Sequence, residues 1–198
     1  MANLSVKTSK SSMTKKLNDK NIRIALVQKL QKLATPPKTI IEELSVNLGQ
    51  AIADVVSIHK EAHCYEIKGD GDKIERIEKQ GSSYNLAFRR ITLVTTEKHA
   101  KKSIELAPQN WGILIAYVDM NETIKFKYLR KAKVNPQFDK KTALQTLWKS
   151  EMLQIASHFN VKLNRSEMTR DAIIEKVSKT ASKEGINLEI STKLTERL

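Results

Sequence analysis

The sequence predicts an α/β fold in which helices flank a mixed β-sheet, followed by a small C-terminal helical region. Three observations carry this prediction. Apolar runs rich in β-branched residues recur between residues 51 and 118. Segments with a helical apolar period separate the later runs, and from about Lys140 that period continues to the end of the chain. Two adjacent strands followed by helix-linked strands indicate both antiparallel and parallel pairs.

The N-terminal part is expected to be a tail and two helices. Residues 1–20 contain five Lys and one Asp, and this polar composition predicts a disordered basic tail. Residues 21–33 repeat apolar side chains at a helical period, and the Pro-Pro pair at 36–37 ends that helix. Residues 39–48 are expected to form a second short helix, closed by Gly49.

The middle of the chain is expected to carry the sheet. The segments "AIADVVSI" and "HCYEIK" predict a hairpin. Asp72 is expected to cap the next helix, with Glu75 three residues later completing a capping box, and this helix runs to about Phe88. The runs "RITLVTT" and "WGILIAYV" predict buried strands joined by the helix "EKHAKKSIELA", and "ETIKFKYLRKA" predicts an edge strand.

The distribution of charge favours a polyanionic partner. The net charge is +13, yet residues 21–118 carry 14 basic and 11 acidic side chains, whereas the last 80 residues carry 16 and 10. Basic flanks around a balanced middle suggest nucleic acid, most simply DNA; solubility alone is the alternative. The expected organisation is a tail (1–20), a core (21–118), an edge strand and linker (119–139), and a helical C-terminal region (140–198).

Other features of the sequence suggest a cytoplasmic location. No apolar run approaches the roughly 18 residues of a membrane helix, and the N-terminus lacks the apolar segment of a secretory signal. The single Cys64 cannot form an internal disulfide, which suits a reducing compartment. We therefore expect no membrane association.

A candidate metal site is expected at the end of the hairpin. Side chains of a strand alternate between faces, so Glu66 and Lys68 point the same way. A tight turn would bring Asp54, on the preceding strand, close to Glu66. Two carboxylates suit a hard divalent cation, Mg²⁺ or Mn²⁺, which neutralises phosphate charge and lowers the pKa of a bound water. Lys68 would orient that water or stabilise developing charge.

These residues resemble a known family. Asp54, eleven intervening residues and then Glu66-Ile67-Lys68 resemble the core of the PD-(D/E)xK nuclease superfamily. The wider context, from "IIEELSVNLGQAIADVV" through "RITLVTTEKH" to "WGILIAY", is similar to a branch of small bacterial and phage proteins in that superfamily. The resemblance covers residues 21–118. It implies a restriction-endonuclease-like fold and a metal-dependent nuclease that hydrolyses phosphodiester bonds, in DNA.

The resemblance also implies roles for individual residues. Asp54, Glu66 and the carbonyl of Ile67 would hold Mg²⁺ or Mn²⁺, and Lys68 would be the catalytic lysine. Glu43, on the helix expected before the hairpin, would reach the metal through water.

Two residues of the following helix also match, and three positions depart from the pattern. Gln80 matches a position for a polar side chain beside the site, and Tyr84 falls one helical turn later, as a candidate nucleic-acid contact. An Arg is usual where this chain has Ile52, a Pro where it has Ala53, and a Ser where it has Gly69. These departures put the rate and the choice of substrate in doubt more than metal binding.

Simpler explanations exist for the same residues. Glu66 and Lys68 would also fit the exposed face of an edge strand, and Glu43 a solvated helix face. Asp70 and Asp72 are expected to be turn and cap residues rather than ligands.

Other chemistries fit the sequence less well. His59, His63 and Cys64 do not match the spacing of a structural zinc site, and no fourth ligand is nearby. Cys64 also lacks the partners of a thiol nucleophile. Trp111 begins an apolar strand and is expected in the core.

The C-terminal region is read in two ways. Two helical stretches joined by "NVKLNRSEMT" are similar to small SAP-type DNA-binding modules, and then Lys162, Arg165 and Arg170 would contact phosphates. The alternative is a helical cap packed on the core. For the whole chain, the alternatives to a nuclease are a non-catalytic nucleic-acid-binding protein with this fold and an assembly protein of a phage, mobile element or defence system. A homodimer or a partner protein stays open, as does RNA in place of DNA.

Overall fold

Six strands form one mixed sheet in the computed structural model, which describes residues 17–197. The strands follow the same order across the sheet as along the chain. Neighbours are antiparallel except for β3–β4 and β4–β5, which are parallel. The predicted α/β class is therefore confirmed, and the expected edge strand is β6. The strands are β1 (Thr39–Val46), β2 (Ala51–Ile58), β3 (Ala62–Lys68), β4 (Arg90–Thr96), β5 (Gly112–Val118) and β6 (Ile124–Arg130).

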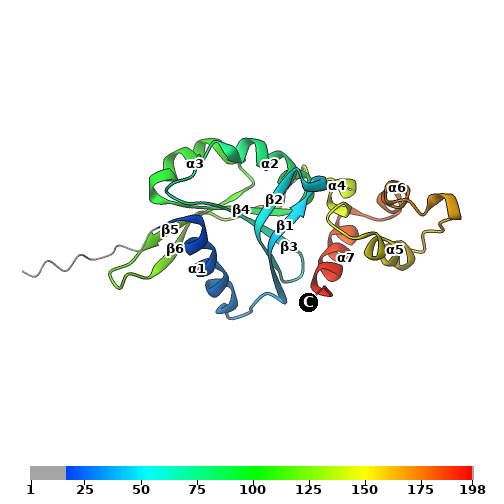
Figure 1. Ribbon diagram of the computed structural model, residues 1–198, viewed down its shortest axis with the longest axis horizontal. Coiled ribbons are helices and arrows are strands. Elements are labelled where there is room, and N and C mark those ends of the chain that lie inside the picture. Colours follow the sequence, from blue (N-terminus) through cyan, green and yellow to red (C-terminus); the bar gives the residue numbers. More distant parts are fainter. Residues whose placement is uncertain (1–16, 198) are drawn as a thin grey trace, which may run out of the picture.

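Helices cover both faces of the sheet, as Figure 1 shows. Parallel neighbours need crossover connections, which α2 (Arg76–Ala87) and α3 (Ala100–Leu106) provide on one face. A 3-10 turn, η2 (Glu97–His99), precedes α3. The opposite face is covered by α1 (Asp19–Gln31), whose buried side chains pack against those of the central strands. The buried residues of α1 are Ile22, Leu26 and Leu30.

Four helices follow the sheet, where two helical stretches were expected. Their buried side chains join the apolar core on the α2 face, so a single core runs from the sheet into this region. Figure 1 shows α5 and α6 farthest from the sheet. The helices are α4 (Lys140–Leu144), α5 (Lys149–His158), α6 (Arg170–Thr180) and α7 (Lys183–Thr195), with a 3-10 turn, η3 (Arg165–Glu167), before α6.

The helix predicted for residues 39–48 is wrong, because this segment is strand β1. Its register against β2 runs from Thr39 opposite Ile58 to Val46 opposite Ala51. The strand begins with two β-branched residues after Thr39, which favour a pleated surface, and pairing with β2 satisfies the backbone that a short helix would leave open. Gly49, at a φ of +84°, is the last residue of a 3-10 turn, η1 (Asn47–Gly49), between β1 and β2, and does not end an α-helix.

Two smaller predictions near the site also need correction. The tail was expected to reach residue 20, but α1 begins at Asp19; residues 1–16 lie outside the described part of the chain. The capping box is wrong, because α2 begins at Arg76 and its N-cap residue, Glu75, makes no side-chain cap bond. Asp72 instead accepts a hydrogen bond from the N–H of Gly69 (2.7 Å) and shapes the turn after β3.

Gly69 lets the start of α1 pass close to the end of β3, and we predict that Gly69→Ala destabilises this contact. A Cβ at this position would lie 2.7 Å from the carbonyl oxygen of Leu17 and 2.9 Å from Asn18 backbone atoms. The N–H of Asp70 donates to that same Leu17 carbonyl (2.8 Å). Because backbone has to move, we expect a loss of about 1–3 kcal/mol in the free energy of unfolding. Chemical denaturation measures it, with Gly71→Ala, in open space, as the control.

Candidate functional site

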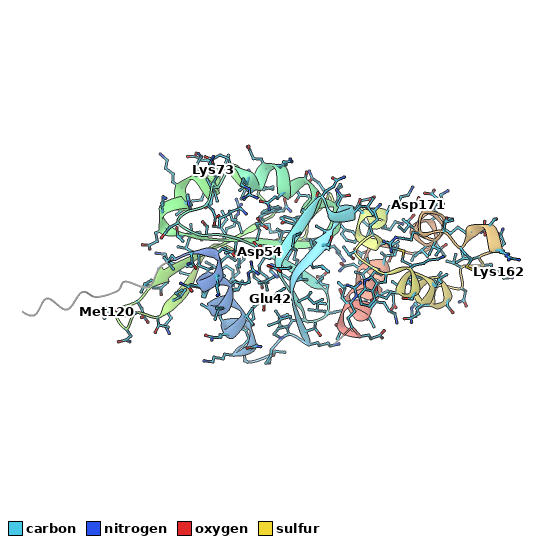
Figure 2. All side chains as sticks on the ribbon, viewed as in Figure 1. Glu42, Asp54, Lys73, Met120, Lys162 and Asp171 are labelled. Carbon is cyan, nitrogen blue, oxygen red and sulfur yellow. The ribbon has the colours of Figure 1, made fainter. Side chains whose placement is uncertain are left out.

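The site is built where strands β2 and β3 separate. These strands pair from Val55 opposite Tyr65 to Ile58 opposite Ala62, and no pair precedes Val55. At the opening, the N–H of Ile67 donates to Oδ2 of Asp54 (2.6 Å), so a side chain takes over where the backbone ladder stops. Figure 2 shows Asp54 beside the hairpin, near the centre of the molecule. The expected closeness of Asp54 to the Glu66-Ile67-Lys68 segment is thus present.

Glu66 and Lys68 form a buried ion pair. Glu66 is 0% exposed and Lys68 6% exposed, because β3 is an interior strand covered by α2. The explanation that both lie on the exposed face of an edge strand is therefore wrong. Lys68 Nζ donates to Oε1 of Glu66, while Oε2 of Glu66 is buried with no hydrogen-bond partner. Buried carboxylate oxygens are almost always partnered, so this atom is unusual; the Tyr84 hydroxyl, which interacts with Glu66, donates its hydrogen bond to Ile52 instead.

Helix α2 contributes two side chains to this region. Tyr84 is fully buried, and its hydroxyl donates to the carbonyl of Ile52 (2.7 Å), so it positions β2 and is not at the surface for a nucleic acid to contact. Burial, followed by the charge of Glu66, raises the pKa of Tyr84, which keeps the phenol protonated. One turn earlier, Oε1 of Gln80 is buried and unpartnered. Gln80 therefore has a free amide beside the carboxylates.

A cavity of about 590 Å³ lies between β1, β2 and α2. Asp54 and Gln80 line it, whereas Glu66 and Lys68 are not among its lining residues and are buried in the sheet. Ile52 is 52% exposed and stands at the cavity, at the position where the resemblance implies an Arg. The full lining is Glu43, Gly49, Gln50, Ala51, Ile52, Asp54, Arg76, Lys79 and Gln80.

Glu43 lines the same cavity, but from strand β1 and not from the predicted helix. Its φ of +57° interrupts the pairing of β1 with β2, which joins Glu42 to Val55 and Leu44 to Ala53. The unpaired residue opposite Glu43 is Asp54. The pairing of β1 with β2 is thus interrupted at this one position, where both carboxylates lie.

Arg23 of α1 contacts the acidic residues of the site, although the sequence did not identify it as a candidate. Its guanidinium binds Asp19 and Glu43 (both 2.8 Å) and lies 4.0 Å from Oδ1 of Asp54. The hydrogen bond to Glu43 is the main reason for the raised pKa of Arg23. This contact ties α1 to the hairpin from the other face. A sequence signal existed, since Asp19 and Arg23 are spaced as an i,i+4 pair on one helix face.

The surroundings of Asp54 make its ionised form less favourable. Burial, followed by the negative charge of Glu66, raises the pKa of Asp54 to about 7. A divalent cation between the two carboxylates would reverse this shift. Within residues 17–197, no group of three or more His, Cys, Asp or Glu side chains is arranged to hold a metal ion. Coordination would therefore combine Asp54 and Glu66 with oxygens of another kind, such as Gln80 Oε1 or the Ile67 carbonyl.

The residues of the rejected chemistries have structural places. Cys64 is fully buried, and burial raises the pKa of its thiol well above the usual range. The ring of His63 stacks on Tyr65, with 4.4 Å between ring centroids. Trp111 is fully buried and donates from Nε1 to Oδ1 of Asn85 (2.7 Å), so its predicted place in the core is confirmed.

Comparison with known proteins identifies the family. A family model described as "Bacteriophage P4 protein cII" matches residues 12–196, which is most of the chain. The chain belongs to this family. It is 25% identical over 162 residues to "Protein cII" of Enterobacteria phage P4, a match that covers 81% of this chain and 61% of that protein. This member of the P4 cII family thus spans about three fifths of the length of that relative. No solved structure gives a significant match.

The described residues of this P4 cII family member contain no helix long and apolar enough to cross a membrane. Its basic side chains include three in the C-terminal region that were candidates for phosphate contact. Lys162 and Arg165 are exposed beyond α5, and Figure 2 shows Lys162 at the tip farthest from Asp54. Arg170 instead donates to the carbonyls of Leu147 (2.9 Å) and Gln145 (3.2 Å), after helix α4.

We predict that these three basic residues separate into two classes. Arg170→Ala should lower the free energy of unfolding by about 2 kcal/mol, because it removes charge-assisted bonds to two carbonyls, and should leave DNA affinity per folded molecule unchanged. Lys162→Ala/Arg165→Ala should leave stability unchanged and weaken DNA binding. Denaturation and fluorescence anisotropy measure the two quantities. Unchanged DNA affinity in the double variant would favour a helical cap that packs on the core.

Proposed function

We propose that this protein is a metal-dependent nuclease of the PD-(D/E)xK type that hydrolyses phosphodiester bonds in DNA. The observation that carries the proposal is the buried, unpartnered Oε2 of Glu66 in a sheet position beside Asp54 and Lys68. Lys68 Nζ already pairs with Oε1 of Glu66, and a bound cation would add positive charge beside the second carboxylate, Asp54. Burial, followed by the negative charge of Glu66, raises the pKa of Asp54, so the ionised carboxylate lacks full compensation in the protein.

The residues present fit a hard divalent cation. Asp54 and Glu66 would hold Mg²⁺ or Mn²⁺, with the Ile67 carbonyl and the Gln80 amide oxygen as further oxygen ligands. When bound, such an ion supplies charge neutralisation at the phosphate and a more acidic water. Glu43, at the mouth of the cavity, would contact water molecules of that ion.

The remaining residues position the reacting groups. The hydrogen bond from Lys68 to Glu66 fixes the position of the Lys68 ammonium. This ammonium would stabilise negative charge that develops on the phosphate. Tyr84 fixes the strand that carries Asp54 through its bond to the Ile52 carbonyl. The basic flanks of the chain would add sequence-independent affinity for the nucleic-acid backbone.

A second candidate is a non-catalytic nucleic-acid-binding or assembly protein of a phage that keeps this fold. The position of Arg23 favours it, since a guanidinium 4.0 Å from Oδ1 of Asp54 already supplies positive charge at the site. The family description names a phage protein and no enzymatic activity, so the family match supports this candidate more directly than it supports hydrolysis.

One experiment separates the two candidates. Purified protein is incubated with labelled single-stranded DNA, duplex DNA and RNA in Mg²⁺, Mn²⁺ or EDTA, and Mn²⁺ binding is followed by electron paramagnetic resonance. A nuclease should bind Mn²⁺ and cleave only with the divalent ion present, and Asp54→Asn should lose both properties. Binding of nucleic acid with neither Mn²⁺ uptake nor cleavage would support the non-catalytic candidate and refute hydrolysis.

A further inference from the structure

Two basic side chains of α2, Arg76 and Lys79, form one wall of the 590 Å³ cavity that contains Asp54. They are three residues apart, so they lie on the same side of the helix. Gln80, the next residue, lines the cavity as well. The α2 side of the cavity therefore carries two basic side chains and one amide side chain.

Neither side chain is used inside the protein. Arg76 and Lys79 are both exposed, and neither side chain makes an ion pair or a hydrogen bond with any of residues 17–197. Their helix neighbour Glu75 is paired with Lys102 of α3, on another side of α2. The positive charge of Arg76 and Lys79 therefore remains available to a ligand.

The opposite wall of the cavity has the opposite charge. Asp54 lines it from β2 and Glu43 from β1, and Oε1 of Glu43 is paired with Arg23. The cavity has acidic side chains on one side and unpaired basic side chains on the other. It suits an anionic ligand that meets the acidic side through a bound cation and the basic side directly. A phosphodiester backbone has this property, because each nucleotide adds a further phosphate.

We propose that Arg76 and Lys79 hold phosphates of a nucleic-acid backbone lying along α2, next to the phosphate at Asp54 and Glu66. Gln80 is not counted among these contacts, because its buried atom without a partner is Oε1, which accepts hydrogen bonds and cannot donate to a phosphate. This inference rests on the proposed nucleic-acid substrate, but not on hydrolysis. It makes Arg76 and Lys79 backbone contacts that set the position of the strand and carry no sequence preference.

The simpler explanation is that Arg76 and Lys79 only contribute to solubility. Lys73 and Lys101 provide the comparison, because both are exposed and unpaired in the described structure but neither lines the cavity. Figure 2 shows Lys73 on the outer surface of the helical layer, away from Asp54. Arg76→Ala/Lys79→Ala and Lys73→Ala/Lys101→Ala remove the same charge from the same side of the molecule.

The test measures binding of labelled single-stranded DNA, duplex DNA and RNA by fluorescence anisotropy, in EDTA and in Ca²⁺, over a series of salt concentrations. Relative to the control, Arg76→Ala/Lys79→Ala should bind at least about tenfold more weakly. The slope of log affinity against log salt should fall by between about 1 and 2, as expected for two lost phosphate contacts. The substrate most affected identifies the preferred nucleic acid. Mn²⁺ binding should be unchanged, because neither residue is a ligand.

The outcomes separate this inference from the proposed function. If the wild-type protein neither binds Mn²⁺ nor cleaves, hydrolysis is refuted. If Arg76→Ala/Lys79→Ala then still binds nucleic acid more weakly than the control, with a smaller dependence of affinity on salt, the phosphate contacts are supported. A wild-type protein that cleaves, with a double variant matching the control in affinity and slope, would overturn the inference alone. Absence of binding to all three nucleic acids would overturn it as well.

Discussion

Asp54→Asn is expected to abolish Mn²⁺ binding and cleavage while making the protein more stable at neutral and alkaline pH. The substitution keeps the shape of the side chain, and the Asn oxygen still accepts the hydrogen bond of the Ile67 N–H. It removes one of the two carboxylate charges at the site. We expect cleavage to fall more than about a hundredfold, because the variant loses a ligand of the ion that would neutralise charge on the phosphate.

The gain in stability follows from the raised pKa of Asp54. In the unfolded chain this carboxyl titrates near 3.8, and in the folded protein at about 7. The folded state therefore binds more protons between about pH 4 and pH 7, and stability falls as pH rises through this window and stays low above it. Asp54→Asn should lack this fall. The Asp54 side chain is still 19% exposed, so we expect a gain on the order of 2 kcal/mol at pH 8.

Denaturant titrations of both proteins between pH 4 and pH 8, with and without Mn²⁺, check this prediction. Mn²⁺ should stabilise the wild type, more at pH 8 than at pH 5, and should not affect Asp54→Asn. Parallel pH profiles for the two proteins would show that the Asp54 carboxylate carries no unfavourable charge. If Mn²⁺ stabilises Asp54→Asn, other residues are the metal ligands.

Removing either partner of the Glu66–Lys68 pair should be the most destabilising change at the site. Lys68→Ala leaves Glu66 buried without its donor, and Glu66→Gln leaves a buried ammonium without its counter-charge. Each should cost about 3 kcal/mol of the free energy of unfolding. Lys102→Ala is the control, because its partner Glu75 is exposed and such pairs contribute little.

The double variant Glu66→Gln/Lys68→Met separates the structural role from the functional one. Replacing a buried pair with uncharged side chains of similar volume is often neutral, so most of the lost stability should return. Mn²⁺ binding and cleavage should not return. If this stable double variant cleaves nucleic acid, Glu66 and Lys68 are not required for hydrolysis. Failure to recover stability would show that the pair contributes more than charge compensation to packing.

Much of the sheet was readable from the sequence because its strands are buried. The segments around Val56, Leu93 and Leu114 are continuous apolar runs rich in β-branched residues, and both crossover helices were recognised by their period. Asp54, Glu66 and Lys68 stood out for the same reason, because charged residues inside such runs are rare unless they are paired or functional. The sequence by itself thus determined the core strands and named the main candidates for chemistry.

Only the tertiary structure decided how these candidates are arranged. Residues 39–46 become a strand because β2 offers a partner edge, which no local pattern records. Arg23 pairs with Glu43 from α1, and Arg76 lines the cavity from α2, so their roles depend on how these two helices pack. The local period of a segment fixes which faces are apolar, but contacts between distant segments depend on the whole fold and fix which charges are paired, buried or left free.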